Sequence, residues 1–277
     1  MITFRKIKSG IHYLGKQLLP DFYSRRQFKH FEAALHCEVE LQLLPFLCER
    51  EKSSLDIGAA GGLYMVHMIK YSSACIAFEP IPKAGDELER FASKIDGNIV
   101  IERIALSDTR GHATLRMLKE DLGRSTIETE NKLEDNAGGR KISIIVPMKP
   151  LDDYNYSNIG LVKIDVEGHE LSVLKGSTKL ITQNYPSFIV EIEDRHKENA
   201  IKDVTDFLMG YGYKCYFILN SKLIPFSEFN KCIHQDAENI GDSSNNYSRK
   251  GIYINNFVFV SAHKEEELLK AAKTLLQ

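Results

Sequence analysis

The chain has 277 residues, 43% of them hydrophobic, and a formal net charge of −2 at pH 7. This length suits one α/β domain with additions, and the balanced charge argues against a broad basic surface for nucleic acid. No apolar run approaches the length of a membrane span. The five cysteines include no C-x-x-C pair, which disfavours a zinc site and a disulfide framework and favours a reducing, cytoplasmic compartment.

The first fifty residues differ in pattern from the rest of the chain. Residues 1–50 are expected to form an N-terminal helical extension, because apolar residues such as Phe28, Phe31 and Leu35 recur at helical spacing. Residues 51–277 are expected to form the main domain. The start of the chain is mildly amphipathic, so peripheral contact with a membrane surface is one interpretation. Packing on the chain's own domain or on a partner subunit is the preferred one.

Strand-like and helix-like segments alternate from Ser53 onward. The early strands are expected at Ser54–Ile57, Ala74–Phe78 and Ile99–Arg103, with helices at 62–71 and 83–95. The later strands are expected at Leu161–Asp165, Ser187–Ile192, Tyr213–Leu219, Leu223–Pro225 and Asn256–Val260, with helices after residue 170, at 200–211 and at 264–276. Such alternation predicts right-handed crossovers and a mostly parallel sheet flanked by helices, which the last strands close in an antiparallel arrangement.

The alternation is interrupted between residues 112 and 146. His112–Leu118 and Ile142–Val146 have strand character, and the polar segment 119–140 between them is too long for a tight turn. We expect this segment to be an excursion near the ligand face or a mobile lid.

A glycine-rich turn follows the first strand. Its pattern, Asp56-x-Gly58-x-Ala60-x-Gly62, differs from the dinucleotide fingerprint Gly-x-Gly-x-x-Gly. Small residues let a ligand approach the backbone, and the helix start beyond them offers free N–H groups to an anionic or carboxylate-bearing ligand. The pattern resembles the nucleotide loop of class I S-adenosylmethionine (SAM) methyltransferases. The candidate cofactor-binding residues of this turn are Asp56, Gly58, Ala59, Gly61 and Gly62.

Two further strand ends carry residues suited to a nucleoside. Glu79 ends the second strand, about 20 residues after the glycine turn, where an acidic side chain can accept hydrogen bonds from ribose hydroxyls. Pro80 follows it and stops the strand. Ala105, Ser107 and Asp108 follow the third strand and are also candidate cofactor-binding residues.

The densest polar cluster follows the strands at 161–165 and 187–192. Asp165, Glu167, Glu170 and His196 are the candidate catalytic residues, since crowded carboxylates raise one another's pKa and a nearby histidine can act as a general base. Carboxylates from two strand ends can alternatively hold a divalent cation such as Mg²⁺. Glu170 has a structural alternative as a first-turn helix acid, and His196 has one as a surface residue.

Several motifs together resemble those of the FkbM-type methyltransferases. They are Leu55-Asp56-Ile57-Gly58-Ala59, Phe78-Glu79-Pro80, Ala105-Leu106-Ser107-Asp108, Leu151-Asp152-Asp153-Tyr154, the run from Lys163 to Glu170, and Val190-Glu191. They stand in the order found in that family, from about Ser53 to Ile192. The resemblance implies a class I, Rossmann-like fold and a SAM-dependent O-methyltransferase, often one that acts on sugar or polyketide hydroxyls. Ala60 departs from the family pattern, which has Asn after Gly-Ala.

Two other functions remain open from the sequence. A nucleotide-dependent oxidoreductase uses a similar sheet, although the missing Gly-x-Gly-x-x-Gly argues against it. A non-catalytic module that keeps the SAM-binding fold is the other alternative. The expected partner is a small-molecule or glycan acceptor, and the sequence identifies neither this acceptor nor the oligomeric state.

Overall fold

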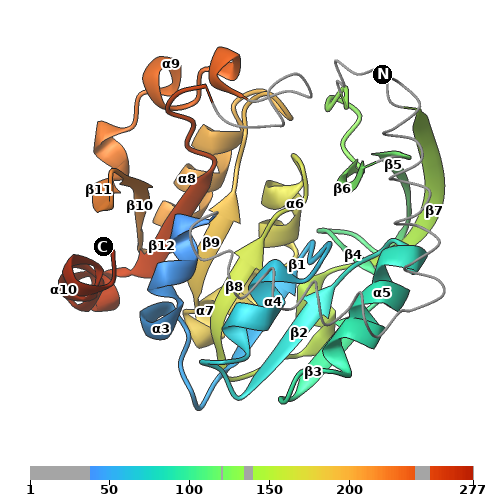
Figure 1. Cartoon of the computed structure of the whole chain (residues 1–277), viewed down its shortest axis with the longest axis horizontal. Coiled ribbons are helices and arrows are strands. Elements are labelled where there is room, and N and C mark those ends of the chain that lie inside the picture. Colours follow the sequence, from blue (N-terminus) through green and yellow to red (C-terminus); the bar gives the residue numbers. More distant parts are fainter. Residues whose placement is uncertain (1–37, 120, 134–139, 241–249, 277) are drawn as a thin grey trace, which may run out of the picture.

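A computed structural model gives the fold of residues 38–119, 121–133, 140–240 and 250–276. Within these residues, helices surround one large sheet, and a small second sheet stands beside it on the side of α5 (Figure 1). The described end of the N-terminal extension consists of η2 (Val39–Leu43) and α3 (Leu44–Leu47), whose leucines are buried in the core of the main domain. The helices expected in residues 1–37 lie outside the described part of the chain.

The large sheet has eight strands in the described residues, in the order β11-β10-β12-β9-β8-β1-β2-β3. Their bounds are β1 Ser53–Ile57, β2 Ala74–Phe78, β3 Ile99–Glu102, β8 Ile159–Ile164, β9 Ser187–Glu191, β10 Tyr213–Leu219, β11 Lys222–Pro225 and β12 Asn256–Ser261. Strands β3, β2, β1, β8 and β9 are parallel, and β12 is antiparallel to both of its neighbours. The predicted parallel sheet with an antiparallel end is thus confirmed.

Helices cover both faces of this sheet. Their bounds are α4 Leu63–Met68, α5 Pro82–Ala92, α6 Glu170–Lys175, α7 Thr178–Asn184, α8 Ala200–Gly210, α9 Lys231–His234 and α10 Glu265–Leu275. Helix α4 is shorter than the expected 62–71: it begins after Gly62, which has a left-handed backbone (φ 86°), and it ends at Met68. No helix among the described residues has the length and apolar character needed to cross a membrane.

Alternating side chains of the parallel strands divide the core into two clusters. Leu55 and Ile57 pack with α6, α7 and α8 on one face, whereas Cys75 and Ala77 pack with α3, α4, α5 and α10 on the other. Cys75 and Cys215, which lie in apolar strands, are buried free thiols. The period of two in these strands is what allows a sheet covered on both faces.

The small sheet has the order β4-β7-β5-β6 in the described residues. Its strands are β4 Ala105–Leu106, β5 Gly111–Leu118, β6 Asp121–Thr126 and β7 Lys141–Lys149. The segment 119–140, which we expected to be an excursion near the ligand face or a mobile lid, contains a strand at residues 121–126, which pairs antiparallel with β5. Residues 120 and 134–139 of that segment lie outside the described part. A separate apolar cluster, which includes Leu115 and Val146, packs this sheet against Ile81 beside α5.

Candidate functional site

The site lies where the strand order of the large sheet reverses, between β1 and β8. Chains leave neighbouring strands in opposite directions at such a point and open a crevice for ligands. Gly58, in the turn after β1, has a φ of 81°, and a Cβ atom on it would stand 1.8 Å from the carbonyl oxygen of Asp165. The glycine therefore lets the turn pack directly on the end of β8.

Asp56 anchors this turn from inside the protein. Its Oδ2 accepts a hydrogen bond of 2.9 Å from the backbone N–H of Met65 in α4. The residue is 3% exposed, and this burial raises the pKa of its carboxyl to about 7 against the opposing effect of Lys163. Asp56 was predicted to bind cofactor, and its contact with α4 ties the two ends of the glycine turn together.

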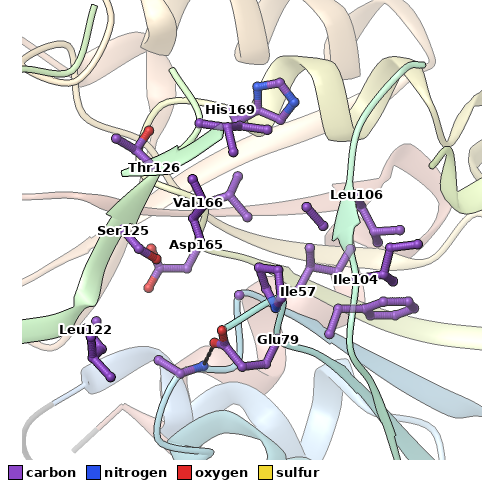
Figure 2. A pocket seen from close by; sticks show the side chains of 18 residues that line it. Ile57, Glu79, Ile104, Leu106, Leu122, Ser125, Thr126, Asp165, Val166 and His169 are labelled. Atoms are coloured by element: carbon purple, nitrogen blue, oxygen red, sulfur yellow. Dashed lines mark hydrogen bonds between the residues drawn. The ribbon is translucent and has the colours of Figure 1, made fainter. Parts of the chain in front are cut away.

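Glu79 joins the turn to the end of β2. Its Oε2 accepts a hydrogen bond of 3.0 Å from the Ala60 N–H, and its Oε1 accepts one of 2.8 Å from the Ile81 N–H. Burial raises the pKa of its carboxyl to about 7, although both hydrogen bonds favour the ionised form. Figure 2 shows the Glu79 carboxylate at one end of a cavity.

This cavity runs along the carboxyl ends of the parallel strands. It encloses about 550 Å³ of empty space, counting the part open to solvent. Its lining comes from the large sheet and from β4, β5 and β6 of the small one: Ile57, Gly58, Ala60, Phe78, Glu79, Pro80, Ile104, Ala105, Leu106, Leu115, Leu122, Gly123, Ser125, Thr126, Ile127, Asp165, Val166 and His169 (Figure 2). Ligands of open α/β sheets bind outside the carboxyl ends of the strands, which is where this cavity lies.

Strand β6 belongs to the segment expected near the ligand face and forms a wall of the cavity, but the sequence did not predict that it is a strand. Leu122, Gly123, Ser125 and Thr126 belong to its lining. Leu122 and Gly123 also line a neighbouring cavity of about 630 Å³, together with Ala60 and Glu79. The residues of β6 show no strand periodicity. The one sequence signal for a strand here was the position of the segment between two expected strands.

The predicted cofactor residues divide into those that line a cavity and those that do not. Gly58, Glu79, Pro80 and Ala105 line the first cavity, and Gly61 lines the second. Asp56, Ala59, Gly62, Ser107 and Asp108 are absent from both linings. Ser107 bonds His169 instead, with 2.9 Å between its Oγ and Nε2.

Asp165 is the predicted catalytic residue that lines the cavity. Figure 2 shows it across from Ser125 and Thr126 of β6. Burial raises the pKa of its carboxyl to about 6, and the Lys163 ammonium opposes this rise. Lys163 is itself 1% exposed; its Nζ donates a hydrogen bond of 3.2 Å to Asn256 Oδ1 and lies 3.9 Å from the Glu191 carboxylate.

The other three catalytic candidates, Glu167, Glu170 and His196, do not line this cavity. Both acids interact with His196. His196 is 4% exposed, and its Nε2 lies 2.9 Å from Glu167 Oε2. Burial lowers the pKa of His196, but the Glu167 contact outweighs it and the pKa is raised above 6.5. His196 is therefore not the surface residue of the structural alternative.

Glu170 is the first residue of α6 and is 1% exposed. Its Oε1 accepts a hydrogen bond of 2.8 Å from the Gly168 N–H, while its Oε2 is buried without a hydrogen-bond partner. Burial raises the pKa of its carboxyl to about 7. Glu170 thus combines the helix-start position of its structural alternative with a burial that an exposed first-turn acid lacks.

The expected divalent cation has no evident ligand set. Among the residues that the structure describes, no group of three or more His, Cys, Asp or Glu side chains is arranged to hold a metal ion.

The sheet order, the glycine turn after β1 and the acidic residue at the end of β2 define the class I methyltransferase fold. The family model of the methyltransferase FkbM domain matches residues 56–215. The chain belongs to this family. This assignment replaces the alternative of a nucleotide-dependent oxidoreductase.

Two relatives and one solved structure illustrate the similarity. A protein named hexuronic acid methyltransferase AglP, from Haloferax volcanii, is 29% identical over 169 residues, which cover 61% of this chain and 66% of the relative. A protein named methyltransferase sdnD, from Sordaria araneosa, is 32% identical over 152 residues, which cover 44% of this chain and 59% of the relative. The chain thus spans at most about two thirds of these relatives. The crystal structure of methyltransferase FkbM from Methylobacillus flagellatus is 14% identical, covers 76% of this chain and 44% of that one, and has a TM-score of 0.47.

Proposed function

We propose that the protein transfers the methyl group of SAM to a hydroxyl group of a glycan or other small molecule. The observation that carries this proposal is the cavity at the ends of β1, β2 and β8, which has the Glu79 carboxylate, the Gly58 turn and the Asp165 carboxylate in one lining. The donor requires an acid that binds its ribose and a turn that lets it approach the backbone, which Glu79 and Gly58 can supply. The reaction requires an acid beside the reacting atoms, which Asp165 can supply.

The residues present fit the cofactor. Each Glu79 oxygen accepts one backbone N–H and has a further lone pair for a ribose hydroxyl. Ile104, Leu106 and Leu115 supply apolar walls suited to a flat base. When bound, SAM supplies a methyl group activated by a positively charged sulfonium.

Asp165 is the residue to which we assign the proton of the acceptor hydroxyl. Its pKa of about 6 leaves the carboxylate mostly ionised at neutral pH and nevertheless more basic than an ordinary aspartate. A base poised near the working pH is the most effective one. His196 is less suited, because its raised pKa increases the protonated fraction and its Nε2 already contacts Glu167.

The charge of the site favours a hydroxyl over a carboxylate as the acceptor. Glu167, Glu38 and Glu193 all act on the Asp165 carboxyl electrostatically. The cations nearby are already paired, Lys163 with Glu191 and Arg195 with Glu193. A negatively charged acceptor would therefore be repelled at the position where a neutral hydroxyl can approach. Although one relative is named for a hexuronic acid, we propose a hydroxyl acceptor for this chain.

The proposal is tested by binding and by transfer. Calorimetry with SAM and with NAD should give saturable binding of SAM alone. A labelled-methyl assay should then be run over paired acceptors that differ in one group, such as a glucoside and the corresponding glucuronide, beside glycolipids and polyketides. Transfer to hydroxyls supports the proposal. SAM binding without transfer to any acceptor would support a non-catalytic module, and labelled methyl ester formation on the uronate would overturn the hydroxyl assignment.

A further inference from the structure

Glu167 has an unusual backbone for its residue type. It lies in the turn after β8, which ends at Ile164, and has a φ of 54°. The next residue, Gly168, has a φ of 106°. The left-handed region costs a residue with a Cβ about 1–2 kcal/mol. Such a conformation persists only where its surroundings hold it, and it gathers at functional sites.

Two side chains from outside the turn hold this peptide. Thr126 Oγ1 donates a hydrogen bond of 2.8 Å to the Glu167 carbonyl oxygen, and Asn131 Nδ2 donates one of 2.9 Å to the same oxygen. Thr126 and Asn131 are 0% and 4% exposed. Both lone pairs of the carbonyl are thus used by the segment Thr126–Asn131, which we call the clamp segment.

The clamp segment is itself fixed at several points. Asn131 Oδ1 accepts a hydrogen bond of 3.0 Å from the Leu133 N–H. Glu128 Oε1 lies 2.5 Å from His169 Nδ1, and Glu128 Oε2 lies 3.2 Å from Lys197 Nζ. The clamp segment therefore contacts the 167–169 turn at two residues, Glu167 and His169.

The carboxylate of Glu167 contacts His196, with 2.9 Å between Oε2 and Nε2. Glu193 lies 3.9 Å from the same ring nitrogen. Arg195 opposes the protonation of this ring, and Glu170 is the remaining acid that interacts with it. Glu167 thus contacts the clamp segment through its carbonyl oxygen and His196 through its carboxylate.

We propose that Thr126 and Asn131 are positioning residues, which hold the carbonyl of Glu167 so that its carboxylate meets His196 and completes the acidic side of the methyl-transfer site. Docking of the clamp segment and assembly of the Glu167–His196 pair are then one event. The proposal rests on the proposed function for the statement that this pair serves methyl transfer. The pairing itself is independent of SAM and of any acceptor.

The test is a titration of His196 in the ligand-free full chain. Histidines carrying ¹³C at Cε1 are followed by NMR, and the His196 signal is assigned by its loss in His196→Gln. Glu167→Gln should lower the pKa of His196 by about one pH unit or more, since it removes the opposite charge. Thr126→Val and Asn131→Ala should each lower this pKa in the same direction. Thr182→Val is the matched control, because its Oγ1 bonds backbone carbonyls at an exposed position of helix α7, and it should leave the pKa unchanged.

An unchanged His196 pKa in folded Asn131→Ala and Thr126→Val would overturn the proposal. Each variant removes one of the two hydrogen bonds to the Glu167 carbonyl. If one variant does not fold, the other alone therefore still tests the proposal. Should neither fold, Asn131→Ser, which shortens the side chain beyond reach of the carbonyl and keeps a polar group there, gives the same comparison. If the variants lower the His196 pKa but the natural protein itself transfers no methyl group, the result counts against the proposed function alone.

Discussion

The carboxylate of Asp56 and the backbone N–H of Met65 are joined by a hydrogen bond of 2.9 Å across the glycine turn. Asp56 lies in β1 and Met65 in the first turn of α4, so the bond fixes the width of the turn that separates them. The carboxyl is buried, and its pKa of about 7 shows that the protein interior favours its neutral form. This relationship makes the stability of the ligand-free protein depend on pH.

Asp56→Asn should be more stable than the natural protein at pH 8 and similar to it in acid. A carboxyl whose pKa rises from 3.8 to about 7 on folding stabilises the fold fully below pH 3.8, and this contribution is lost as pH rises through 7. The difference corresponds to about 4 kcal/mol as an upper limit. The amide stays neutral at every pH and its oxygen still accepts from Met65.

Urea unfolding of both proteins at pH 5 and pH 8 measures this difference. Asp203→Asn, in the exposed first turn of α8, should follow the pH dependence of the natural protein. Equal stability of Asp56→Asn and the natural protein at both pH values would mean that Asp56 is ionised in the folded state.

Gly58→Ala should destabilise the protein far more than Gly212→Ala. Both glycines have a φ above 80°, but a Cβ on Gly58 would stand 1.8 Å from the Asp165 carbonyl oxygen, whereas one on Gly212 meets nothing within 4 Å. Gly212→Ala should lower the free energy of unfolding by about 1–2 kcal/mol, the cost of a left-handed alanine. Gly58→Ala adds the overlap with β8, so its loss should be at least about twice as large. Similar losses in urea unfolding would mean that the turn moves away from Asp165 easily.

The sheet and its glycine turn were predictable because their signals are local. Buried parallel strands such as Ala74–Phe78 are continuous apolar runs, and their acidic or glycine ends mark the side where ligands bind. Glu79 was identified from its distance to the turn alone, and the structure places it in the cavity lining. Its role toward a nucleoside stays a prediction.

Strand β6 was not predictable, since nothing in Asp121–Thr126 alternates between apolar and polar residues. Its order comes from pairing with β5, where Arg116 faces Thr126 and Met117 faces Ser125. The contact between Glu167 and His196 was not predictable either. The sequence brought both residues into one cluster, but the left-handed backbone that aims Glu167 depends on Thr126, which comes from a distant part of the chain.

Glu79→Ala should weaken SAM binding by about 1.5–3 kcal/mol, the worth of hydrogen bonds to a charged acceptor. This loss corresponds to about a ten- to hundredfold higher Kd. Only the ionised carboxyl accepts from both hydroxyls, so binding to the natural protein should weaken as pH falls through about 7, and this dependence should shrink in the variant. Calorimetry from pH 6 to 8 measures both effects.

Glu266→Ala, an exposed acid in α10, serves as the control for Glu79→Ala and should bind SAM normally. An unchanged Kd in Glu79→Ala would place the ribose contact on another residue. Unfolding of the ligand-free variant is measured in parallel, because Glu79 also accepts the Ala60 and Ile81 N–H groups.

Asp165→Asn should lower the rate of methyl transfer by a factor of about 100 or more, as for other general bases, and leave SAM affinity nearly intact. The amide keeps the shape of the side chain but neither accepts a proton nor carries charge. In the natural protein the rate should rise with pH through about 6, where the Asp165 carboxyl ionises, and this rise should be absent in the variant. Single-turnover transfer to the best acceptor, followed from pH 5 to 8, measures both expectations.

Two results would assign Asp165 differently. A preserved rate with collapsed SAM binding would make it a cofactor-binding residue, and the base would lie elsewhere. Asp203→Asn controls for loss of a carboxylate in general and should transfer at the natural rate. Treatment of the natural protein with EDTA separates the last possibility. Activity that is lost and restored by Mg²⁺ would require a metal held beside Asp165, whereas unchanged activity supports the carboxylate itself as the group that takes the proton of the acceptor hydroxyl.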